Sequence, residues 1–327
     1  MIDNSQELIV SVNCIAYNQK KYIQDCLDGI VMQKTTFRFE AIVHDDVSTD
    51  GTADVIKEYG EKYPDIIKPI FEKENQWSKN DGSLDRIMLD ACKGKYIAFC
   101  EGDDYWIDPY KLQKQVDYLE AHPECSLVYT KVKYWKESDN DFIGTIGHDT
   151  NFVKLLCTYN EIPTPSVLIR RNHYIKYFID INPYDKKWKM GDYPLVLYIS
   201  KWSKIKLLND VTCVYRLLNN SASHSEKESK LYPYYNSIFD IQMYFYNYLN
   251  IDDRKILNKI YLTRLNLLFS AFLKTDDNCL LKECRNLSKK ASFYKLKDII
   301  KFGLFLKSNF LVRIWRNYSR FKQKYYY

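Results

Sequence analysis

The most informative stretch of the chain reads Tyr96-Ile97-Ala98-Phe99-Cys100-Glu101-Gly102-Asp103-Asp104-Tyr105-Trp106. Its first half is β-branched, aromatic or small, which predicts a buried strand. Three carboxylates follow at the end of that strand, where open α/β sheets bind ligands. Acids so close together repel one another, and a bound cation is the simplest way to neutralise them. Because carboxylate oxygens are hard ligands, we expect Mg²⁺ or Mn²⁺; an acidic turn before a helix near Asp108 is the alternative.

Two earlier predicted strands, residues 9–16 and 39–44, also end in polar side chains. These side chains are Tyr17 and Asn18 after the first strand and Asp45 and Asp46 after the second. Because the carboxyl ends of parallel strands meet at one edge of a sheet, we expect all three strand ends to line one cleft. Their side chains suit a base, a ribose and a metal-bound diphosphate.

Strands and helices alternate from residue 9 to residue 132, which indicates βαβ units and a mostly parallel sheet. We interpret the polar stretch 137–150 as a loop. The later predicted strands are residues 165–169, 205–208 and 211–215. From residue 233 onward the chain is predicted to be helical, with Asp252-Asp253 and Asp276-Asp277 as helix starts.

Three groups of motifs stand in a particular order along the chain. They are Cys14-Ile15-Ala16-Tyr17-Asn18, His44-Asp45-Asp46 with Ser48 and Asp50-Gly51-Thr52, and Lys93-Gly94-Lys95-Tyr96-Ile97-Ala98 leading into Glu101-Gly102-Asp103-Asp104. This order resembles the nucleotide-sugar half of family 2 glycosyltransferases, over roughly residues 8–225. Two positions depart from the family pattern: the usual Asp-x-Asp reads Glu101-x-Asp103, and Val47 replaces a glycine. We therefore expect the turn at Val47 to avoid positive φ.

The resemblance implies a GT-A fold of the α/β class and an inverting transferase that uses Mn²⁺ or Mg²⁺. Carried over by position, the residues that bind the nucleotide sugar are Ala16, Tyr17, Asn18, Asp45, Asp46, Arg86, Glu101, Gly102, Asp103, Arg216, Ser223 and His224. Glu101 and Asp103 would hold the ribose and the metal, with His224 as a further metal ligand. Either Asp45 or Asp46 would accept a hydrogen bond from the base. His44, inside a predicted strand, is expected to be structural.

A candidate base for the acceptor hydroxyl is Asp192, in Met190-Gly191-Asp192-Tyr193-Pro194-Leu195. It stands at the start of a predicted helix, where the positive helix end keeps a carboxylate ionised. Asp before Pro in a first turn is also a common N-cap, so position alone leaves both roles open. The resemblance implies the base, because the family carries an acidic pair here, of which Gly191 replaces the first member.

Downstream, Arg216 follows a predicted strand and precedes Asn219-Asn220-Ser221-Ala222-Ser223-His224-Ser225. An arginine fork matches diphosphate oxygens, and a hydroxyl-rich loop with one histidine could close over them. The resemblance implies this role for Arg216, Ser223 and His224. A surface loop with satisfied polar groups is the alternative.

Composition is that of an ordinary globular protein: of 327 residues, 46% are hydrophobic and 28% are charged. Nine cysteines without a C-x-x-C pair indicate reduced thiols and argue against a zinc site. The first residues lack the basic and apolar regions of a secretory signal, and no apolar stretch is long enough to span a bilayer. We therefore expect a cytoplasmic protein.

The net charge of +6 is unevenly distributed. Residues 282–327 carry 13 Lys and Arg against two acids, giving +11 and leaving −5 for the rest. Within residues 301–324 these charges alternate with apolar residues, which suits either the anionic inner face of the plasma membrane or a helix packed on its own domain. The basic segment could also bind nucleic acid, but no other part of the sequence resembles a module that reads bases. We divide the chain into a GT-A domain, residues 1–228, and a helical, basic region, residues 229–327.

The sequence thus predicts a metal-dependent inverting glycosyltransferase that moves a sugar, preferably from UDP, to a saccharide or lipid-linked saccharide of a bacterial surface polysaccharide such as capsule or lipopolysaccharide. UDP is preferred because a lone carboxylate can accept the uracil N–H. One alternative is a sugar-phosphate nucleotidylyltransferase, although Tyr17-Asn18-Gln19-Lys20-Lys21 lacks the glycines of that class. The other is a non-catalytic scaffold that binds a saccharide or a membrane surface.

Overall fold

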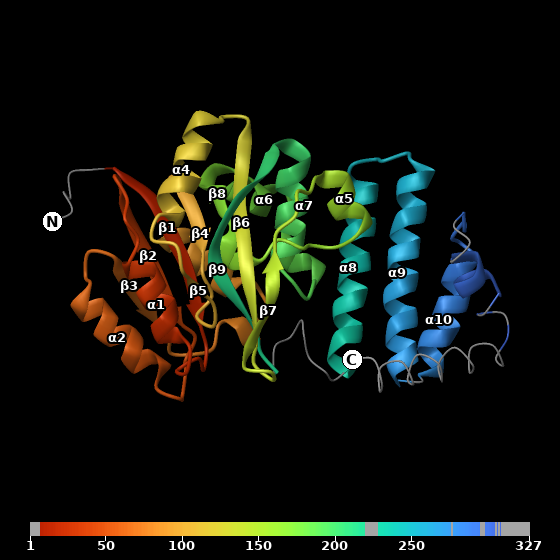
Figure 1. The fold of residues 1–327 in the computed structure, drawn as a ribbon, viewed down its shortest axis with the longest axis horizontal. Coiled ribbons are helices and arrows are strands. Elements are labelled where there is room, and N and C mark those ends of the chain that lie inside the picture. Colours follow the sequence, from red (N-terminus) through yellow and green to blue (C-terminus); the bar gives the residue numbers. More distant parts are fainter. Residues whose placement is uncertain are drawn as a thin grey trace. The chain divides into compact units, whose positions relative to one another are not determined.

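The computed structural model describes residues 7–219, 228–275, 277–294, 298–304, 306 and 308. The chain divides into two compact units (Figure 1). Unit 1 comprises Met1–Phe152 and Asn160–Asn219, and unit 2 comprises Val153–Tyr159 and Asn220–Tyr327. The division differs from a single cut at residue 228, because Val153–Tyr159 groups with the C-terminal helices.

Unit 1 is built from strands and helices that alternate along most of its length. Its strands are β1 (Leu8–Ala16), β2 (Arg38–Asp45), β3 (Ile67–Phe71), β4 (Tyr96–Phe99), β5 (Tyr105–Trp106), β6 (Cys125–Lys136), β7 (Asp141–Ile146), β8 (Leu168–Arg170) and β9 (Lys204–Leu217). Its helices are α1 (Ile23–Val31), α2 (Thr52–Lys62), α3 (Ser83–Ala91), α4 (Lys111–Ala121), α6 (Arg171–Ile181) and α7 (Asp192–Trp202), with short 3₁₀ turns η1 (Trp77–Lys79), η2 (Thr164–Ser166) and η3 (Pro183–Lys186). The predicted α/β class is confirmed.

The strands form one sheet in the order β3-β2-β1-β4-β8-β6-β9-β5, and β7 pairs with β6. Strands β3, β2, β1 and β4 are parallel, as expected from the βαβ pattern. β8 runs antiparallel between β4 and β6, and β6 and β9 are again parallel. Ala16 pairs with Asp45, so the loops after β1 and β2 leave the sheet side by side, at the edge where ligands bind in such folds.

Two segments differ from the sequence-based expectation. The stretch 137–150, predicted as a loop, contains β7, which pairs with β6 from Ile146 to Asp141. Most of β7 is exposed, so its sequence lacks the apolar alternation that marks a half-buried strand. The two strands predicted at 205–208 and 211–215 form the single strand β9. Its register against β6 shifts at Asn209 and Asp210, so that the strand continues past these two residues. A bulge of this kind leaves extra residues unpaired without ending the strand.

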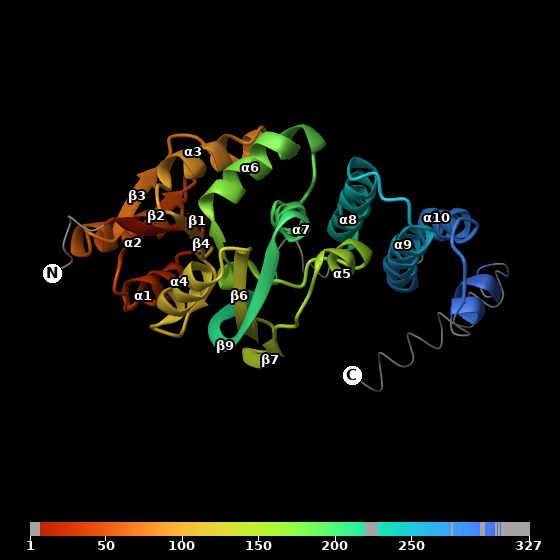
Figure 2. The same ribbon diagram turned by 90° about the horizontal axis from the view of Figure 1, so that it is seen from above.

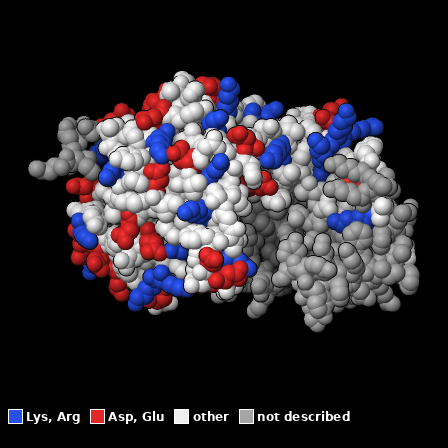
Figure 3. Space-filling model, in the orientation of Figure 1, with Lys and Arg blue, Asp and Glu red and all other residues white. Residues whose placement is uncertain are grey.

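The core of unit 1 lies between the sheet and the helices that cover it. β1 and β2 are almost continuously buried, which is typical of parallel strands with helices on both faces. α1 and α4 lie on one side of the sheet, and α3 and α6 lie on the other (Figure 2). Leu27 of α1 and Leu112 of α4 share a core with Val12 of β1. On the face shown in Figure 3, acidic and basic side chains are interspersed, as on an ordinary solvated surface.

Unit 2 contains most of α5 (Phe152–Cys157), then α8 (Glu228–Tyr248), α9 (Arg254–Thr275), α10 (Asn278–Ser288) and a π-helical turn η4 (Ile299–Leu304). The predicted helix starts are confirmed: Asp253 Oδ1 accepts from Lys255 N–H at 2.7 Å, and Asp277 caps α10 by accepting from Cys279 N–H at 2.8 Å. No helix in the described part of the chain is long and apolar enough to cross a membrane. Most of the basic segment 301–324 lies outside the described residues, as do Ser223 and His224.

Candidate functional site

The acids after β4 form one cluster. Glu101, Asp103 and Asp104 each offer a carboxylate oxygen, and these oxygens lie within 4.8 Å of one another. Asp104 is buried, and its Oδ2 has no hydrogen-bond partner among the described residues. Glu101 is exposed and Asp103 is half-buried. The predicted convergence of acids at the end of this strand is therefore present.

The pKa of each of these three acids is raised above its ordinary value. Loss of hydration raises the pKa of Asp104 well above its ordinary value, and the charges of Asp103 and Glu101 add to this shift. Loss of hydration also raises the pKa of Asp103, although Arg216 partly offsets it. Glu101 keeps an exposed edge, yet reduced hydration and the charges of Asp103 and Asp192 raise its pKa as well. A divalent cation would relieve this repulsion.

A close approach to β1 shapes the loop that carries the cluster. Gly102 N–H donates to the carbonyl oxygen of Ile15 at 3.0 Å. A Cβ atom at Gly102 would lie 2.3 Å from Gln19 Oε1 and 3.1 Å from the Cβ of Ala16, so glycine fits here without displacing the Gln19 side chain. Ala16 and Gly102, both predicted to bind the donor, are buried against each other and set the shape of the loop.

Arg216, in β9, joins the acid loop to α1. Its backbone N–H donates to Asp104 Oδ1 at 2.8 Å, and its Nη1 donates to the carbonyl oxygen of Asp103 at 2.8 Å. Its Nη2 forms an ion pair with Asp25 of α1. The residue predicted to clamp a diphosphate is thus buried and paired with a carboxylate in this structure.

Asp45 and Asp46 differ in what they bind. The Asp46 carboxylate accepts the backbone N–H groups of Gln76 at 2.6 Å and Trp77 at 3.0 Å, so it fixes the start of η1. Asp45 Oδ2 accepts Ser48 N–H at 3.0 Å. Asp45 Oδ1 is buried and has no hydrogen-bond partner within the described ranges. Of the two acids predicted to read the base, Asp45 is the one that retains an acceptor.

The loops after β1 and β2 are tied together beside these acids. Asn18 Oδ1 accepts Thr49 N–H at 2.8 Å, and Asn18 N–H donates to Ser48 Oγ at 2.9 Å. The amide oxygen of Asn18 is therefore occupied by the loop. Tyr17 leaves 51% of its surface exposed at the same edge and can stack on a planar ring.

The turn after Asp46 contradicts one expectation. Val47 has a φ of 67°, so the replacement of glycine by valine does not abolish the left-handed backbone. This conformation is unfavourable for a β-branched residue and persists only where its surroundings impose it. Here Asp46 is held by Gln76 and Trp77, and Ser48 is held by Asp45 and Asn18.

Asp192 is the first residue of α7, and the N-cap position belongs to Gly191. Asn160 Nδ2 donates to Asp192 Oδ2 at 2.6 Å. Loss of hydration raises the pKa of Asp192, and the bond from Asn160 partly offsets this shift. Beyond the loss of hydration, Asp192 lies close enough to Glu101 for its charge to raise the pKa of that residue.

Among the described residues, Arg86 and His44 have other neighbours. Arg86 donates to the carbonyl oxygen of Asp81 at 2.9 Å and lies 5.3 Å from the ring centroid of Tyr184. Ser223 and His224 fall outside the description, so their phosphate and metal contacts stay predictions. His44 is fully buried in β2, with its Nε2 3.3 Å from Glu72 Oε1, as expected for a structural histidine.

Sequence reasoning missed two partners of the predicted residues. Asp25 pairs with Arg216, and Asn160 holds Asp192. Asp25 and Arg216 are 191 residues apart in the sequence, and Asn160 and Asp192 are 32 residues apart, so no local sequence pattern connects the members of either pair. An acid on the exposed face of α1 and an amide in a polar connection both look ordinary in sequence.

Comparison with known proteins places the chain in a family. Residues 11–178 match the family model of Glycosyl transferase family 2. An uncharacterized protein of Mycobacterium tuberculosis is 40% identical over 165 residues, which are 50% of this chain and 47% of that protein, so the match spans about half of that relative. The Escherichia coli UDP-Glc:alpha-D-GlcNAc-diphosphoundecaprenol beta-1,3-glucosyltransferase WfaP is 30% identical over 218 residues, which are 66% of this chain and 80% of that protein.

Two solved structures share the fold. Staphylococcus aureus TarS 1–349 in complex with UDP has a TM-score of 0.60 at 16% identity and covers 98% of this chain and 93% of its own. The mannosyltransferase PcManGT from Pyrobaculum calidifontis was solved in complex with GDP-Man and Mn²⁺. It has a TM-score of 0.56 at 16% identity, and the match covers 97% of this chain and 85% of PcManGT. These likenesses confirm the predicted GT-A-type fold. With the family match over half of its length, the chain belongs to glycosyltransferase family 2, as its motifs predict.

Proposed function

We propose that this chain transfers a sugar from a nucleotide-sugar donor, preferably a UDP-sugar, to a saccharide or lipid-linked saccharide, with inversion and with Mn²⁺ or Mg²⁺. The observation that carries the proposal is the cluster of Glu101, Asp103 and Asp104 after β4, whose carboxylate oxygens lie within 4.8 Å of one another. Asp192 is near enough, beyond the loss of hydration, for its charge to raise the pKa of Glu101. An inverting transferase needs these two parts in one place: a site for the leaving diphosphate and a base for the acceptor hydroxyl.

The acid loop fits a divalent cation. Its carboxylate oxygens lie within 4.8 Å of one another, and Asp104 Oδ2 is a buried oxygen without a partner in the described structure. Hard oxygen donors of this kind suit Mg²⁺ and Mn²⁺. Glu101 and Asp103 would hold the ion, Asp104 would support their loop, and His224 is proposed as a further ligand. When bound, the ion would supply positive charge that stabilises the leaving diphosphate.

We assign recognition of the base to Asp45. Its buried Oδ1 is available to accept a ring N–H such as that of uracil, whereas both oxygens of Asp46 are occupied by backbone N–H groups. The exposed ring of Tyr17 would stack on the base. Two similar proteins support the choice of UDP, because WfaP is by its name a UDP-Glc transferase and TarS was solved with UDP.

Asp192 would take the proton of the acceptor hydroxyl while that oxygen attacks the anomeric carbon from the face opposite the leaving group. A single displacement of this kind inverts the anomeric centre. Asn160 Nδ2 donates to Asp192 Oδ2 at 2.6 Å, which would orient the carboxylate toward the acceptor. Because its pKa is raised by loss of hydration, Asp192 is a stronger base than an ordinary aspartate.

The acceptor class is proposed from a relative. WfaP, by its name, adds glucose to GlcNAc on diphosphoundecaprenol. By analogy, this chain would act on a saccharide carried by a lipid diphosphate during synthesis of a bacterial surface polysaccharide.

The proposal is tested by comparing binding with turnover. Nucleotide sugars are first screened with Mn²⁺ by thermal shift, because a bound ligand raises the melting temperature. With the stabilising donor, Asp192→Asn should keep nucleotide affinity within about twofold while transfer falls by roughly 10²–10⁴-fold. Asp185→Asn, at an exposed aspartate in η3, is the matched control and should change neither quantity. Loss of transfer in the Asp185 variant, with normal turnover in the Asp192 variant, would move the base to Asp185.

A further inference from the structure

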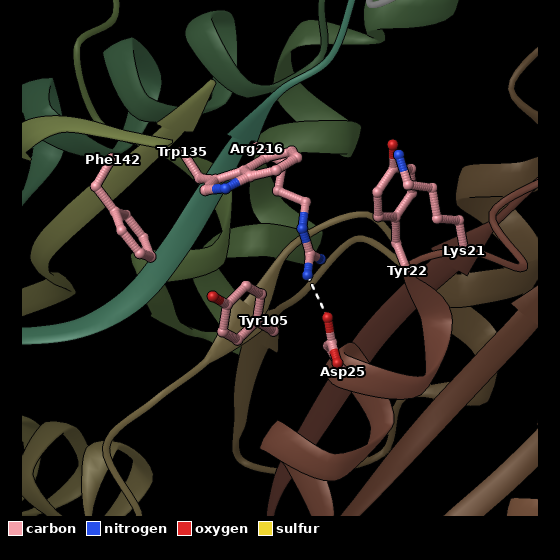
Figure 4. A pocket seen from close by; sticks show the side chains of 7 residues that line it. All are labelled: Lys21, Tyr22, Asp25, Tyr105, Trp135, Phe142 and Arg216. Atoms are coloured by element: carbon pink, nitrogen blue, oxygen red, sulfur yellow. Dashed lines mark hydrogen bonds and ion pairs between the residues drawn. The ribbon is translucent and has the colours of Figure 1, made fainter. Parts of the chain in front are cut away.

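An open pocket in unit 1 adjoins the acid loop and has no role in the steps above (Figure 4). Its volume is about 310 Å³, at the lower end of the range for ligand sites. The residues that line it are Lys21, Tyr22, Asp25, Tyr105, Trp135, Phe142 and Arg216. We refer to these residues as the aromatic pocket.

One wall of the aromatic pocket is a row of paired residues across the sheet. Trp135 of β6 pairs with Arg216 of β9 on one side and with Phe142 of β7 on the other. Directly paired residues project from the same face of a sheet, so the strands align these side chains. Phe142 remains 48% exposed, which burial in a core does not explain.

The other wall comes from α1 and β5. The guanidinium carbon of Arg216 lies 5.0 Å from the ring centroid of Tyr22 and 4.4 Å from that of Tyr105. The Arg216 side chain is 7% exposed and the Asp25 side chain 55% exposed, so their ion pair presents a carboxylate rather than a cation to the solvent. Figure 4 shows this ion pair between the rings of Tyr22 and Tyr105.

The charges of the pocket favour a neutral ligand. Lys21 Nζ lies 3.2 Å from Glu137 Oε1, and Arg216 is paired with Asp25, so both cations already have an anionic partner. A phosphate group would have to compete with those carboxylates for its contacts. Four aromatic rings with a few polar edges instead suit a molecule with an apolar face and a rim of hydrogen-bonding groups.

A pyranose ring has this combination. Its C–H bonds form a weakly positive face that packs on the negative face of an aromatic ring. Its hydroxyls can donate to the Asp25 carboxylate and accept from Lys21. The pocket also adjoins the transfer site: Tyr105 follows Asp104 in the chain, and Arg216 bonds to the carbonyl oxygen of Asp103 at 2.8 Å.

We propose that the aromatic pocket is a subsite for a neutral pyranose ring of the acceptor, other than the ring that is glycosylated. The inference rests on the proposed function, since it assumes a saccharide acceptor at the acid loop. Trp135 and Phe142 supply the stacking surface, and Asp25 supplies a hydrogen-bond acceptor for the hydroxyl rim.

The test uses the full chain with Mg²⁺ and UDP. Saturation-transfer NMR is recorded with methyl β-D-glucopyranoside, methyl N-acetyl-β-D-glucosaminide, cellobiose and lactose as probes, and with glucose 6-phosphate as the anionic comparison. We expect at least one neutral probe to bind, and Trp135→Ala and Phe142→Ala to reduce its signal at least fivefold. The matched controls Trp202→Ala and Ile143→Ala, at side chains 57% and 53% exposed outside the pocket, should leave the signal unchanged.

UDP binding in the same samples separates this inference from the proposed function. Normal UDP affinity with no signal from any neutral probe, or with a signal insensitive to both pocket substitutions, overturns the subsite. Preferential binding of glucose 6-phosphate at the pocket overturns its neutral specificity. Failure of the unsubstituted chain to bind any nucleotide overturns the proposed function instead. Phe142 lies on the exposed strand β7, so Phe142→Ala is expected to fold. If Trp135→Ala does not fold, Phe142→Ala alone tests whether the pocket binds the neutral probe.

Discussion

The two sides of the proposed donor site are stabilised in opposite ways. On the nucleotide side, hydrogen bonds join the loops after β1 and β2: Gln19 N–H donates to Thr52 Oγ1 at 2.8 Å, and Lys20 N–H donates to Asp50 Oδ2 at 3.0 Å. On the acid side, loss of hydration and the neighbouring acids raise the pKa of Asp104, one oxygen of which has no partner in the described structure.

This contrast separates a framework from a ligand site. The nucleotide side is nearly complete without a ligand, so most of its polar groups contribute to the stability of the fold. On the acid side, the ionised carboxylates repel one another and lose hydration unless a cation binds. They are therefore expected to contribute to ligand binding and not to the stability of the fold. Asp45 Oδ1 is the exception on the nucleotide side, because it has no hydrogen-bond partner among the described residues.

The largest effect is expected at Asp103. Asp103→Asn should weaken Mn²⁺-dependent UDP binding by more than about 100-fold, beyond the loss typical of a group that only supports a metal ligand. Without metal, the variant should melt at the same temperature as the unsubstituted chain or higher, because one repulsive charge is gone. Titration calorimetry and thermal melts measure both quantities. Asp139→Asn, in the exposed turn after β6, is the control. Unchanged UDP affinity in Asp103→Asn would place the metal elsewhere.

Asp45 and Asp46 test the contrast within one pair of neighbours. Asp46→Ala removes the acceptor of two backbone N–H groups and should lower the free energy of unfolding by about 3 kcal/mol. Asp45→Ala should cost less stability but weaken UDP binding and relax its preference over GDP and CDP. Urea denaturation and nucleotide competition distinguish the two variants. The opposite pattern, a stable Asp46→Ala protein with lost base selectivity, would assign the base to Asp46.

The acid cluster should make stability depend on pH in a defined direction. The pKa values of Asp104, Asp103 and Glu101 are raised, first by loss of hydration, so the folded chain keeps protons that the unfolded chain has released. Stability from this cluster is therefore full below about pH 4 and is lost as pH rises through the raised pKa values, of which that of Glu101 is about 8. Mn²⁺ competes with those protons, so it should raise the melting temperature more at pH 8 than at pH 5.5. Equal stabilisation by Mn²⁺ at both pH values would argue against a site in this cluster.

Short sequence patterns were enough to predict the strands of this site and the polar residues that follow them. Residues 9–16, 39–44 and 96–100 are predicted to be strands because they are short apolar runs bounded by polar turns, and the polar side chains after them are predicted to line one cleft. The ion pair of Asp25 with Arg216 and the bond from Asn160 to Asp192 could not be foreseen, since each depends on the folded arrangement of distant segments. β7 was missed because an exposed edge strand has no buried face to impose a pattern.

The backbone at Val47 offers the smallest and most local test. Valine at a φ of 67° is unfavourable by about 1–3 kcal/mol, while glycine at the same place loses about 0.5–1 kcal/mol through entropy. Val47→Gly should therefore raise the free energy of unfolding by about 1 kcal/mol. UDP affinity should stay within about twofold, because Asp45 and Asp46 are held by Ser48, Gln76 and Trp77 rather than by the valine side chain. Val47→Ala keeps a side chain in the left-handed conformation and is the matched control, with a smaller expected gain. Destabilisation by Val47→Gly would mean that contacts of the half-buried valine outweigh its backbone strain, and weaker UDP binding would mean that the strained turn itself holds the nucleotide side in its binding conformation.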